Sequence, residues 1–262
     1  MKLRKGKLSL SLGSLLFLLL TLLFRESPEL PIPPSSITVS DGDTISMEIQ
    51  GERETIRYLL MDTPELHHPS RPVEELGKEA REENIRLLSL GPVRLEFDRE
   101  RRDRYGRLLA FVWVRTAQGE IMVNEELVRK GLALPLVIPP NGKYSDRIFS
   151  AMAEAREKGR GLWGRAAKRI FTPAQLWSEA PYLAGTFVTV NMTVEKAEKK
   201  GRRLFLRQGK VTLSAYRSRE TEPLWRLREG DRIRASGKVL LSHKGCEIPL
   251  VSSLQVSLVS SP

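Results

Sequence analysis

Hydrophobic and polar positions alternate in two separate regions of this chain, and the pattern predicts two β-rich domains. In the first region, residues 44–49 alternate with the period of two that a half-buried strand requires. The dipeptide at 50–51 is a turn signal, so residues 56–61 are expected to form the returning strand. Two further apolar runs, at 93–97 and 108–114, also predict strands.

Helical spacing separates these strands. Apolar residues recur every three or four positions over 73–88, and Gly91-Pro92 is expected to stop that helix. Two more helices are expected over 123–130 and 145–158, ending near Gly131 and Gly159. Five short strands with three helices packed on them predict a mixed α+β fold, an OB-type five-stranded barrel.

The second alternating region lies in the last third of the chain. Apolar and polar residues alternate over 188–195, 203–207, 211–216 and 232–235. Each segment has the length and period of a short strand. A second, OB-like small β-barrel is therefore expected there.

These patterns divide the chain into five parts. The predicted parts are a membrane anchor or signal segment at 1–24, a Pro-rich spacer at 25–35, a catalytic domain at 36–165, a linker at 166–182, and the OB-like domain at 183–262.

The N-terminal segment pairs a basic flank with an uncharged apolar run over 8–24. A positive flank before such a run is typical of a segment addressed to a membrane. The small-residue site of a cleaved signal peptide does not follow, which favours an uncleaved anchor over cleavage. Either route predicts an extracytoplasmic location for the rest of the chain.

The charge is concentrated in the C-terminal third. The whole chain carries a formal charge of +11, of which +8 lies in residues 181–262. Residues 35–165 carry only −1. A strongly basic region favours a polyanionic partner such as nucleic acid. Cys246 is the only cysteine, so the fold has no intrachain disulfide.

Three short segments carry candidate chemistry. They are Asp41-Gly42-Asp43-Thr44, the run from Arg57 to Asp62-Thr63-Pro64-Glu65, and Asp103-Arg104-Tyr105-Gly106-Arg107. Each segment alone has a structural reading: a turn, a helix cap, and a hairpin turn.

Together the segments contain what hydrolysis of a phosphodiester needs. Negative charge gathers on the phosphoryl oxygens in the transition state, and a water molecule must be deprotonated. The carboxylates of Asp43 and Asp62 can hold a hard divalent cation. The guanidiniums of Arg57 and Arg107 can each contact two phosphate oxygens, and Glu65 can serve as general base.

The three segments resemble the staphylococcal nuclease family, whose motifs are matched over about residues 37–164. The resemblance implies that Asp43 and Asp62 ligate Ca²⁺, with the main-chain carbonyl of Thr63. It also implies that Glu65 is the general base and that the two arginines bind the scissile phosphate.

The resemblance further implies that Arg104 and Tyr105 contact a nucleotide phosphate. The expected reaction is cleavage of DNA and RNA at the P–O5′ bond, which leaves 3′-phosphates. This chain departs from the family's type member at 134–140, where two base-stacking tyrosines are replaced by a stretch without aromatics. Base affinity is therefore expected to differ.

The second barrel is predicted to expose a face of cations and aromatic rings, on which single strands could track and stack. The candidate residues of this face are Arg203, Phe205, Arg207, Tyr216, Arg232 and Arg234, with Lys238 as a further candidate. The alternative is a solvated basic face that closes a dimer or touches lipid headgroups. For the whole protein, the alternative to an enzyme is a membrane-tethered module that binds nucleic acid or another partner without catalysis.

Overall fold

The structure is a computed structural model that describes residues 32–66, 73–242 and 245–259, and these belong to one compact unit. The predicted anchor at 1–24 and most of the spacer lie outside the described residues. Within the described ranges, no helix is both long enough and apolar enough to cross a membrane.

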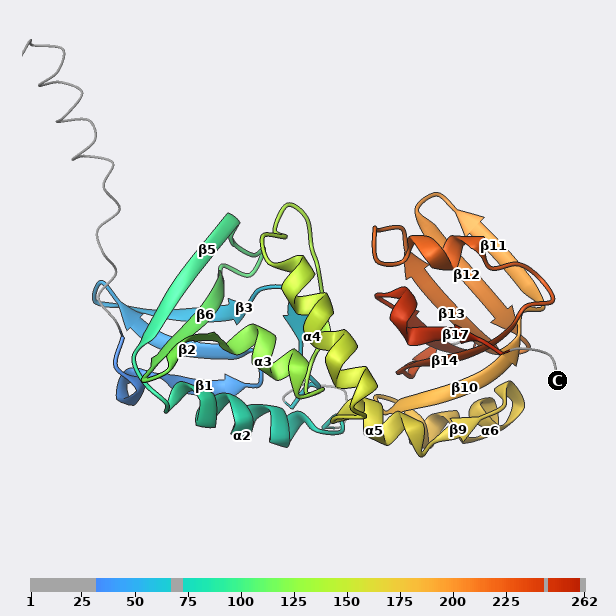
Figure 1. The fold of residues 1–262 in the computed structure, drawn as a ribbon, viewed down its shortest axis with the longest axis horizontal. Helices are drawn as coiled ribbons and strands as arrows, with labels where there is room; N and C mark the ends of the chain where they lie inside the picture. The colour runs from blue at the N-terminus through green and yellow to red at the C-terminus, as the bar shows by residue number, and fades with distance from the viewer. Residues whose placement is uncertain (1–31, 67–72, 243–244, 260–262) are drawn as a thin grey trace, which may run out of the picture. The chain divides into compact units, whose positions relative to one another are not determined.

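The first half is built on a twisted sheet whose strand order is β1-β2-β3-β6-β5, with β7 paired to β6 (Figure 1). Its strands are β1 (Thr38–Asp41), β2 (Thr44–Ile49), β3 (Glu52–Tyr58), β5 (Val93–Arg102), β6 (Leu108–Thr116) and β7 (Gly119–Met122). The pairs are antiparallel except for β3 and β6, which run parallel. This mixed α+β, OB-type architecture confirms the predicted fold class.

The helices α2 (Gly77–Leu88) and α3 (Val123–Arg129) contact this sheet, and α4 (Ser145–Glu157) packs on α3. The short α5 (Leu162–Ala167) follows and contacts α4. The helix α2 packs beside β1, and α3 packs between β6 and α4 (Figure 1). The side chains of Ile45, Phe111 and Met152 are fully buried between these layers, so the hydrophobic core holds the strand ends that carry the motifs.

Several expected boundaries in this half differ from the structure. The strand expected over 93–97 extends to Arg102, and the returning strand expected from residue 56 begins at Glu52. The returning strand ends at Tyr58, because Leu60 adopts a positive φ of 62° and turns the chain. The strand β4 (Met61–Asp62) then pairs with β8 (Leu134–Pro135). The helix predicted from residue 73 begins only at Gly77, after Leu76 at a φ of 66°. Both turns were invisible to the hydrophobic pattern, since leucine rarely adopts this conformation.

The second half contains two sheets, and the chain passes from one to the other more than once. The first has the order β17-β14-β10-β9, and the second has the order β11-β12-β13-β16-β15. Their bounds are β9 (Ile170–Phe171), β10 (Phe187–Thr193), β11 (Lys196–Lys200), β12 (Arg203–Gln208), β13 (Val211–Tyr216), β14 (Arg232–Lys238), β15 (Leu240–Ser242), β16 (Gly245–Leu250) and β17 (Val256–Leu258).

At two points a strand of one sheet is followed almost directly by a strand of the other. Two residues separate β10 from β11, and Val239 alone separates β14 from β15. The strands β11, β12 and β13 form an antiparallel meander, and β13 then pairs parallel to β16. A meander whose third strand pairs parallel to a later strand also occurs in the first half, which supports the prediction of an OB-like second barrel.

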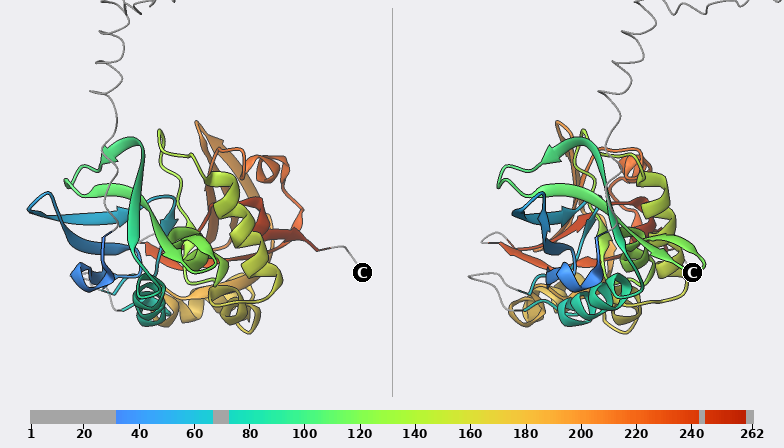
Figure 2. Two further views of the ribbon diagram at one scale, coloured as in Figure 1. Left: turned by 60° about the vertical axis from the view of Figure 1, so that its left-hand side comes forward. Right: turned by 90° about the vertical axis from the view of Figure 1, so that its left-hand side faces the viewer.

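The segment predicted as a linker is structured and joins the two halves. It contains β9 and most of α6 (Pro173–Leu183), whose gold ribbon lies at the lower edge of the views in Figure 2. The strand β9 pairs with β10. The ring of Trp163 in α5 meets that of Phe187 in β10 edge-on, with centroids 5.2 Å apart. Phe187 is part of the same buried cluster as the first-half core, so an apolar contact connects the halves.

Candidate active site

The first motif lies in the tight turn between β1 and β2. Asp41 ends β1, and Asp43 stands just before β2. Gly42 has no room for a side chain, because an added Cβ would come within 3 Å of Thr63 and Ala80. The glycine therefore lets this turn press against the segment that follows β4.

Asp43 is almost completely buried, with 6 % of its surface exposed. Its Oδ2 accepts hydrogen bonds from the backbone nitrogen and the hydroxyl of Thr63, at 2.9 and 2.8 Å. Its Oδ1 accepts a bond from the hydroxyl of Thr44 at 3.0 Å. Buried carboxylates need hydrogen bonds, and these three bonds hold the Asp43 side chain in one orientation.

Arg57 connects the two carboxylates that the sequence suggested for a cation. Its Nη1 lies 2.7 Å from Oδ2 of Asp43, and its Nη2 lies 2.6 Å from Oδ1 of Asp62. The same Nη1 donates to the main-chain oxygen of Met61 at 3.2 Å. The turn at Leu60 makes this possible, because it folds Asp62 back toward the strand that carries Arg57. The two acids thus face one point.

Glu65 lies beside a second acid, Asp41. The side chains of Asp41 and Glu65 share a hydrogen bond. Burial, together with the negative charges of Asp43 and Glu65, raises the pKa of Asp41 to about 6, although the Gly42 amide partly offsets the rise. A carboxyl that holds a proton beside Glu65 can position the Glu65 carboxylate.

The third motif forms a turn that holds Arg107. Asp103 accepts hydrogen bonds from the Tyr105 and Arg107 amides at 2.9 and 3.0 Å and from Arg107 Nε at 2.8 Å. This leaves the two terminal nitrogens of Arg107 available to an anion. Hydrogen bonding to these donors holds the pKa of Asp103 below its usual range, although burial opposes that shift. Tyr105 is 68 % exposed, with Arg104 and Arg107 over its ring at 4.8 and 5.6 Å.

All three motifs line one cavity of about 370 Å³. Its walls are formed by Ser40, Asp41, Asp43, Thr44, Arg57, Asp62, Thr63, Glu65, Glu74, Arg107 and Lys238. Arg104 and Tyr105 stand outside this lining set, on the exposed turn that leads to Arg107. No site role was predicted for Asp41 or Glu74, because a carboxylate in a turn and an acid near a helix start are individually common. Lys238 was predicted as a candidate for the basic face of the second half, and the structure places it in this cavity.

Comparisons with known proteins match the same part of the chain. The model of the staphylococcal nuclease homologue family matches residues 55–165. The thermonuclease of Staphylococcus hyicus is 42 % identical over 127 residues, which cover 48 % of this chain and 73 % of that protein. Endonuclease YncB of Bacillus subtilis is 41 % identical over 128 residues, which cover 48 % of this chain and 59 % of that protein.

The chain belongs to the staphylococcal nuclease family. The resemblance read from the three motifs is therefore confirmed. The staphylococcal nuclease match ends at residue 165, so the second half of the chain lies beyond it.

The acids of this staphylococcal nuclease site suit a hard cation. Asp43 and Asp62 offer carboxylate oxygens, and Thr63 follows Asp62 in the chain and is hydrogen-bonded to Asp43. Across the described ranges, no group of three His, Cys, Asp or Glu residues stands at metal-binding spacing. Arg57 instead pairs with both acids, so a divalent ion would have to replace its contacts with them. The oxygen-only donor set fits calcium or magnesium rather than a softer metal.

The stretch that lacks the family's stacking tyrosines exposes aliphatic residues. Leu136, Val137 and Ile138 are 38, 37 and 62 % exposed. They can pack against a base edge or face, but they lack the π surface on which bases stack.

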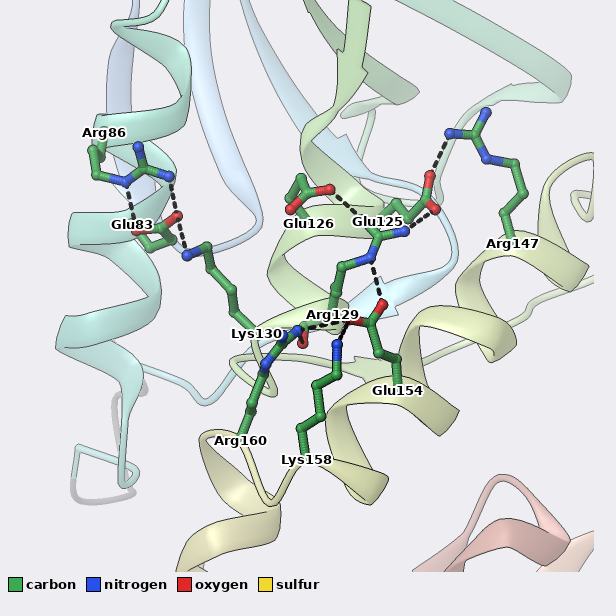
Figure 3. Close-up of polar contacts among 10 residues, drawn as sticks. All are labelled: Glu83, Arg86, Glu125, Glu126, Arg129, Lys130, Arg147, Glu154, Lys158 and Arg160. Carbon is green, nitrogen blue, oxygen red and sulfur yellow. Dashed lines mark hydrogen bonds and ion pairs between the residues drawn. The ribbon is translucent and has the colours of Figure 1, made fainter.

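A second, larger cavity lies away from this site. It measures about 890 Å³ and is lined by charged residues of α2, α3 and α4. Figure 3 shows that Arg129 is bound there by Glu125, Glu126 and Glu154. Lys130 reaches Glu83 across the cavity at 3.4 Å. These paired ions connect three helices of the nuclease domain, and the cavity brings together none of the three motifs.

The structure divides the predicted basic face of the second half between two sheets. Arg203, Phe205, Arg207 and Tyr216 lie together on β12 and β13, with Arg203 over the Phe205 and Tyr216 rings at 4.7 and 5.1 Å. Arg232 and Arg234 lie on β14, in the other sheet.

Two acids also stand on the β12–β13 face. Glu247 lies 3.4 Å from Arg203, and Glu198 pairs with Arg207 and Lys196. Hydrogen bonds from Lys196 and Arg207 lower the pKa of Glu198 to about 2. Both acids therefore offset part of the positive charge on this face.

Proposed function

We propose that this protein hydrolyses phosphodiester bonds of DNA and RNA with calcium as its cofactor, cutting the P–O5′ bond and leaving 3′-phosphates. Membership of the staphylococcal nuclease family identifies it as a nuclease. The observation that carries the proposal is the shared cavity, since Asp43, Asp62, Arg57, Glu65 and Arg107 all line it.

The residues that would hold calcium are Asp43, Asp62 and the main-chain carbonyl of Thr63. When bound, calcium supplies positive charge to a phosphoryl oxygen and helps to order the attacking water. Asp43 is fixed for this role by its two bonds from Thr63.

The two arginines meet the negative charge of the transition state from different elements. Arg57 comes from β3, and Arg107 comes from the turn before β6. Without a cation, Arg57 is held by Asp43 and Asp62, and calcium at these acids would free its guanidinium for the phosphate. Arg107 keeps its partner Asp103, and a donor oriented in advance needs no reorganisation when the phosphorane-like charge develops.

Glu65 is the group that takes the proton of water. It lines the cavity beside Asp41, and the side chains of the two acids share a hydrogen bond. This bond can orient the Glu65 carboxylate toward the water molecule that it deprotonates, as a general base requires.

The test is cleavage of single-stranded DNA and RNA by residues 32–262, with calcium and with EGTA. We expect cutting of both nucleic acids with calcium and at least a hundredfold less with EGTA, because the cation and its charge are removed. Tight binding without cutting under any divalent ion would instead support the non-catalytic module.

The second β domain is proposed to bind single-stranded nucleic acid on its β12–β13 face. Arginines lie against two aromatic rings there. The phosphates of a single strand could contact the arginines while its bases stack on the rings. In OB-type barrels the second and third strands of the barrel form the usual oligonucleotide surface. The strands β12 and β13 occupy that place in the meander.

Replacing Arg203 and Arg207 by Ser should reduce the salt dependence of single-strand binding. Each lost phosphate contact removes about 0.7 from the slope of log K against log salt, so the pair should lower it by about 1.4. The measurement is fluorescence anisotropy of a labelled oligonucleotide, with EGTA present to prevent cutting.

The matched control is the pair Arg232→Ser and Arg234→Ser, which removes two charges from the other sheet. A slope lowered equally by both pairs, or by neither, would return the β12–β13 face to an ordinary solvated surface.

The apolar N-terminal run is proposed to tether the nuclease outside the cytoplasm, as an uncleaved anchor or as a signal segment removed after export. Its basic flank and its length of about 17 uncharged residues support this proposal.

A further inference from the structure

The cavity of the nuclease domain contains one residue from the second β domain. Lys238, the last residue of β14, lies among the lining side chains with Arg57, Glu65 and Arg107. It lies more than seventy residues beyond the end of the family match. The contacts of this side chain show what it can do in the cavity.

Lys238 is bound to one buried acid. Its Nζ lies 2.9 and 3.2 Å from the two carboxylate oxygens of Glu74, so one ammonium binds both. The Glu74 side chain is only 4 % exposed. A buried carboxylate requires such a partner, because burial without one strongly disfavours the charged form.

Glu74 in turn holds the backbone of the proposed general base. Its Oε2 accepts a hydrogen bond from the Glu65 amide at 3.1 Å, and its own amide donates to the Glu65 carbonyl at 2.9 Å. These two bonds join Glu65 and Glu74 directly. The position of Glu65 therefore depends on where the Glu74 carboxylate points.

The contact is supported by packing around it. Gly185 stands against Glu74, where an added Cβ would lie 3.2 Å from its Cγ. Glu75, the next residue, is bound by Arg169 at 2.6 Å and by Arg165 at 3.5 Å. The Trp163–Phe187 contact fixes the same junction through its apolar side. The second domain and the region before it thus pack against the residues just before α2.

We propose that the second β domain completes the nuclease site, with Lys238 as a positioning residue that acts through Glu74 on Glu65. Lys238 neutralises the Glu74 carboxylate, which then stays inside and holds the Glu65 amide. Without that ammonium, the carboxylate turns toward water and Glu65 loses its anchor. This inference rests on the proposed nuclease function, and it adds a dependence on residues outside the family match.

The test compares Lys238→Met with Lys238→Arg in calcium-dependent cleavage of a short oligonucleotide. The Met variant should lower kcat by about tenfold with little change in KM, since outer-shell partners typically contribute 10- to 100-fold. The Arg variant should recover most of the loss, because a guanidinium can also bind both Glu74 oxygens. Lys210→Met, which removes an exposed lysine of the same domain, is the matched control and should leave kcat unchanged.

A double variant separates positioning from a general loss of charge. With Glu74→Gln present, Lys238→Met should cause little further loss, because both changes break one chain of contacts. Additive losses, or equal kcat values for Lys238→Met and the wild type, would overturn the proposal.

Hydrogen exchange at the Glu65 amide decides the point independently of activity. In Lys238→Met this amide should exchange at least tenfold faster than in the wild type and in Lys210→Met, while amides in β6 are unchanged. If the wild-type protein did not cut nucleic acid, the proposed function would fail, and this exchange rate would still test the contact. Unchanged exchange at Glu65 would reject the positioning role.

Discussion

Replacing Glu65 by Gln is expected to lower kcat for calcium-dependent DNA cleavage by at least about a hundredfold. Gln has nearly the same size and can keep a hydrogen bond to Asp41, but it cannot take a proton from water. General bases contribute roughly 10²- to 10⁴-fold, so the loss should exceed that of any change outside the cavity. Single-turnover cleavage of a labelled oligonucleotide measures it.

The control is Glu79→Gln, an exposed acid in the first turn of α2 that does not line this cavity. It should cut like the wild type. Oligonucleotide affinity measured with EGTA should differ little among the three proteins. Retention of more than a third of the wild-type kcat in Glu65→Gln would remove Glu65 from the role of base.

Replacing Arg57 by Gln is expected to change activity and calcium binding in opposite directions. Cleavage should fall by about a hundredfold or more, because a donor to the transition-state charge is lost. Calcium should bind about tenfold more tightly in the absence of nucleic acid. Arg57 is paired with Asp43 and Asp62, and its removal leaves two carboxylates that a cation can neutralise. Isothermal titration with calcium and a cleavage assay give the two values.

Arg107→Gln is the matched control for this experiment. Arg107 lines the same cavity, but its partner is Asp103 and neither of the two acids. Its loss should also reduce cleavage, while calcium affinity stays within about threefold of the wild type. Equal changes in calcium affinity for both arginine variants would contradict a cation position between Asp43 and Asp62.

The candidate site residues could be predicted from the sequence, but the contacts among their side chains could not. Asp43, Arg57 and Asp62 stood out because the three motifs together hold carboxylates for a hard cation and guanidiniums for a phosphate. Their mutual contacts depend on Leu60, which turns the chain at a positive φ. Nothing in the local pattern marks a leucine for that conformation, so the predicted strand ran through the turn.

The second domain shows the same limit at longer range. Alternation along the chain predicted its strands, and the alternating residues do lie on opposite faces of β12 and β14. Alternation carries no information on which sheet each strand joins. The predicted basic face therefore combined Arg203 of one sheet with Arg232 of another. The reach of Lys238 to Glu74 depends on the packing of two domains, and a sequence read in one dimension cannot show it.

The most direct test of the account is a crystal structure of the protein with calcium and a deoxynucleoside 5′-phosphate. We predict calcium held by Asp43, Asp62 and the Thr63 carbonyl, with the guanidiniums of Arg57 and Arg107 on the same phosphate and Glu65 facing it. Calcium bound elsewhere, or a phosphate that contacts only one of the two arginines, would contradict the claim that these residues act on a single phosphoryl group.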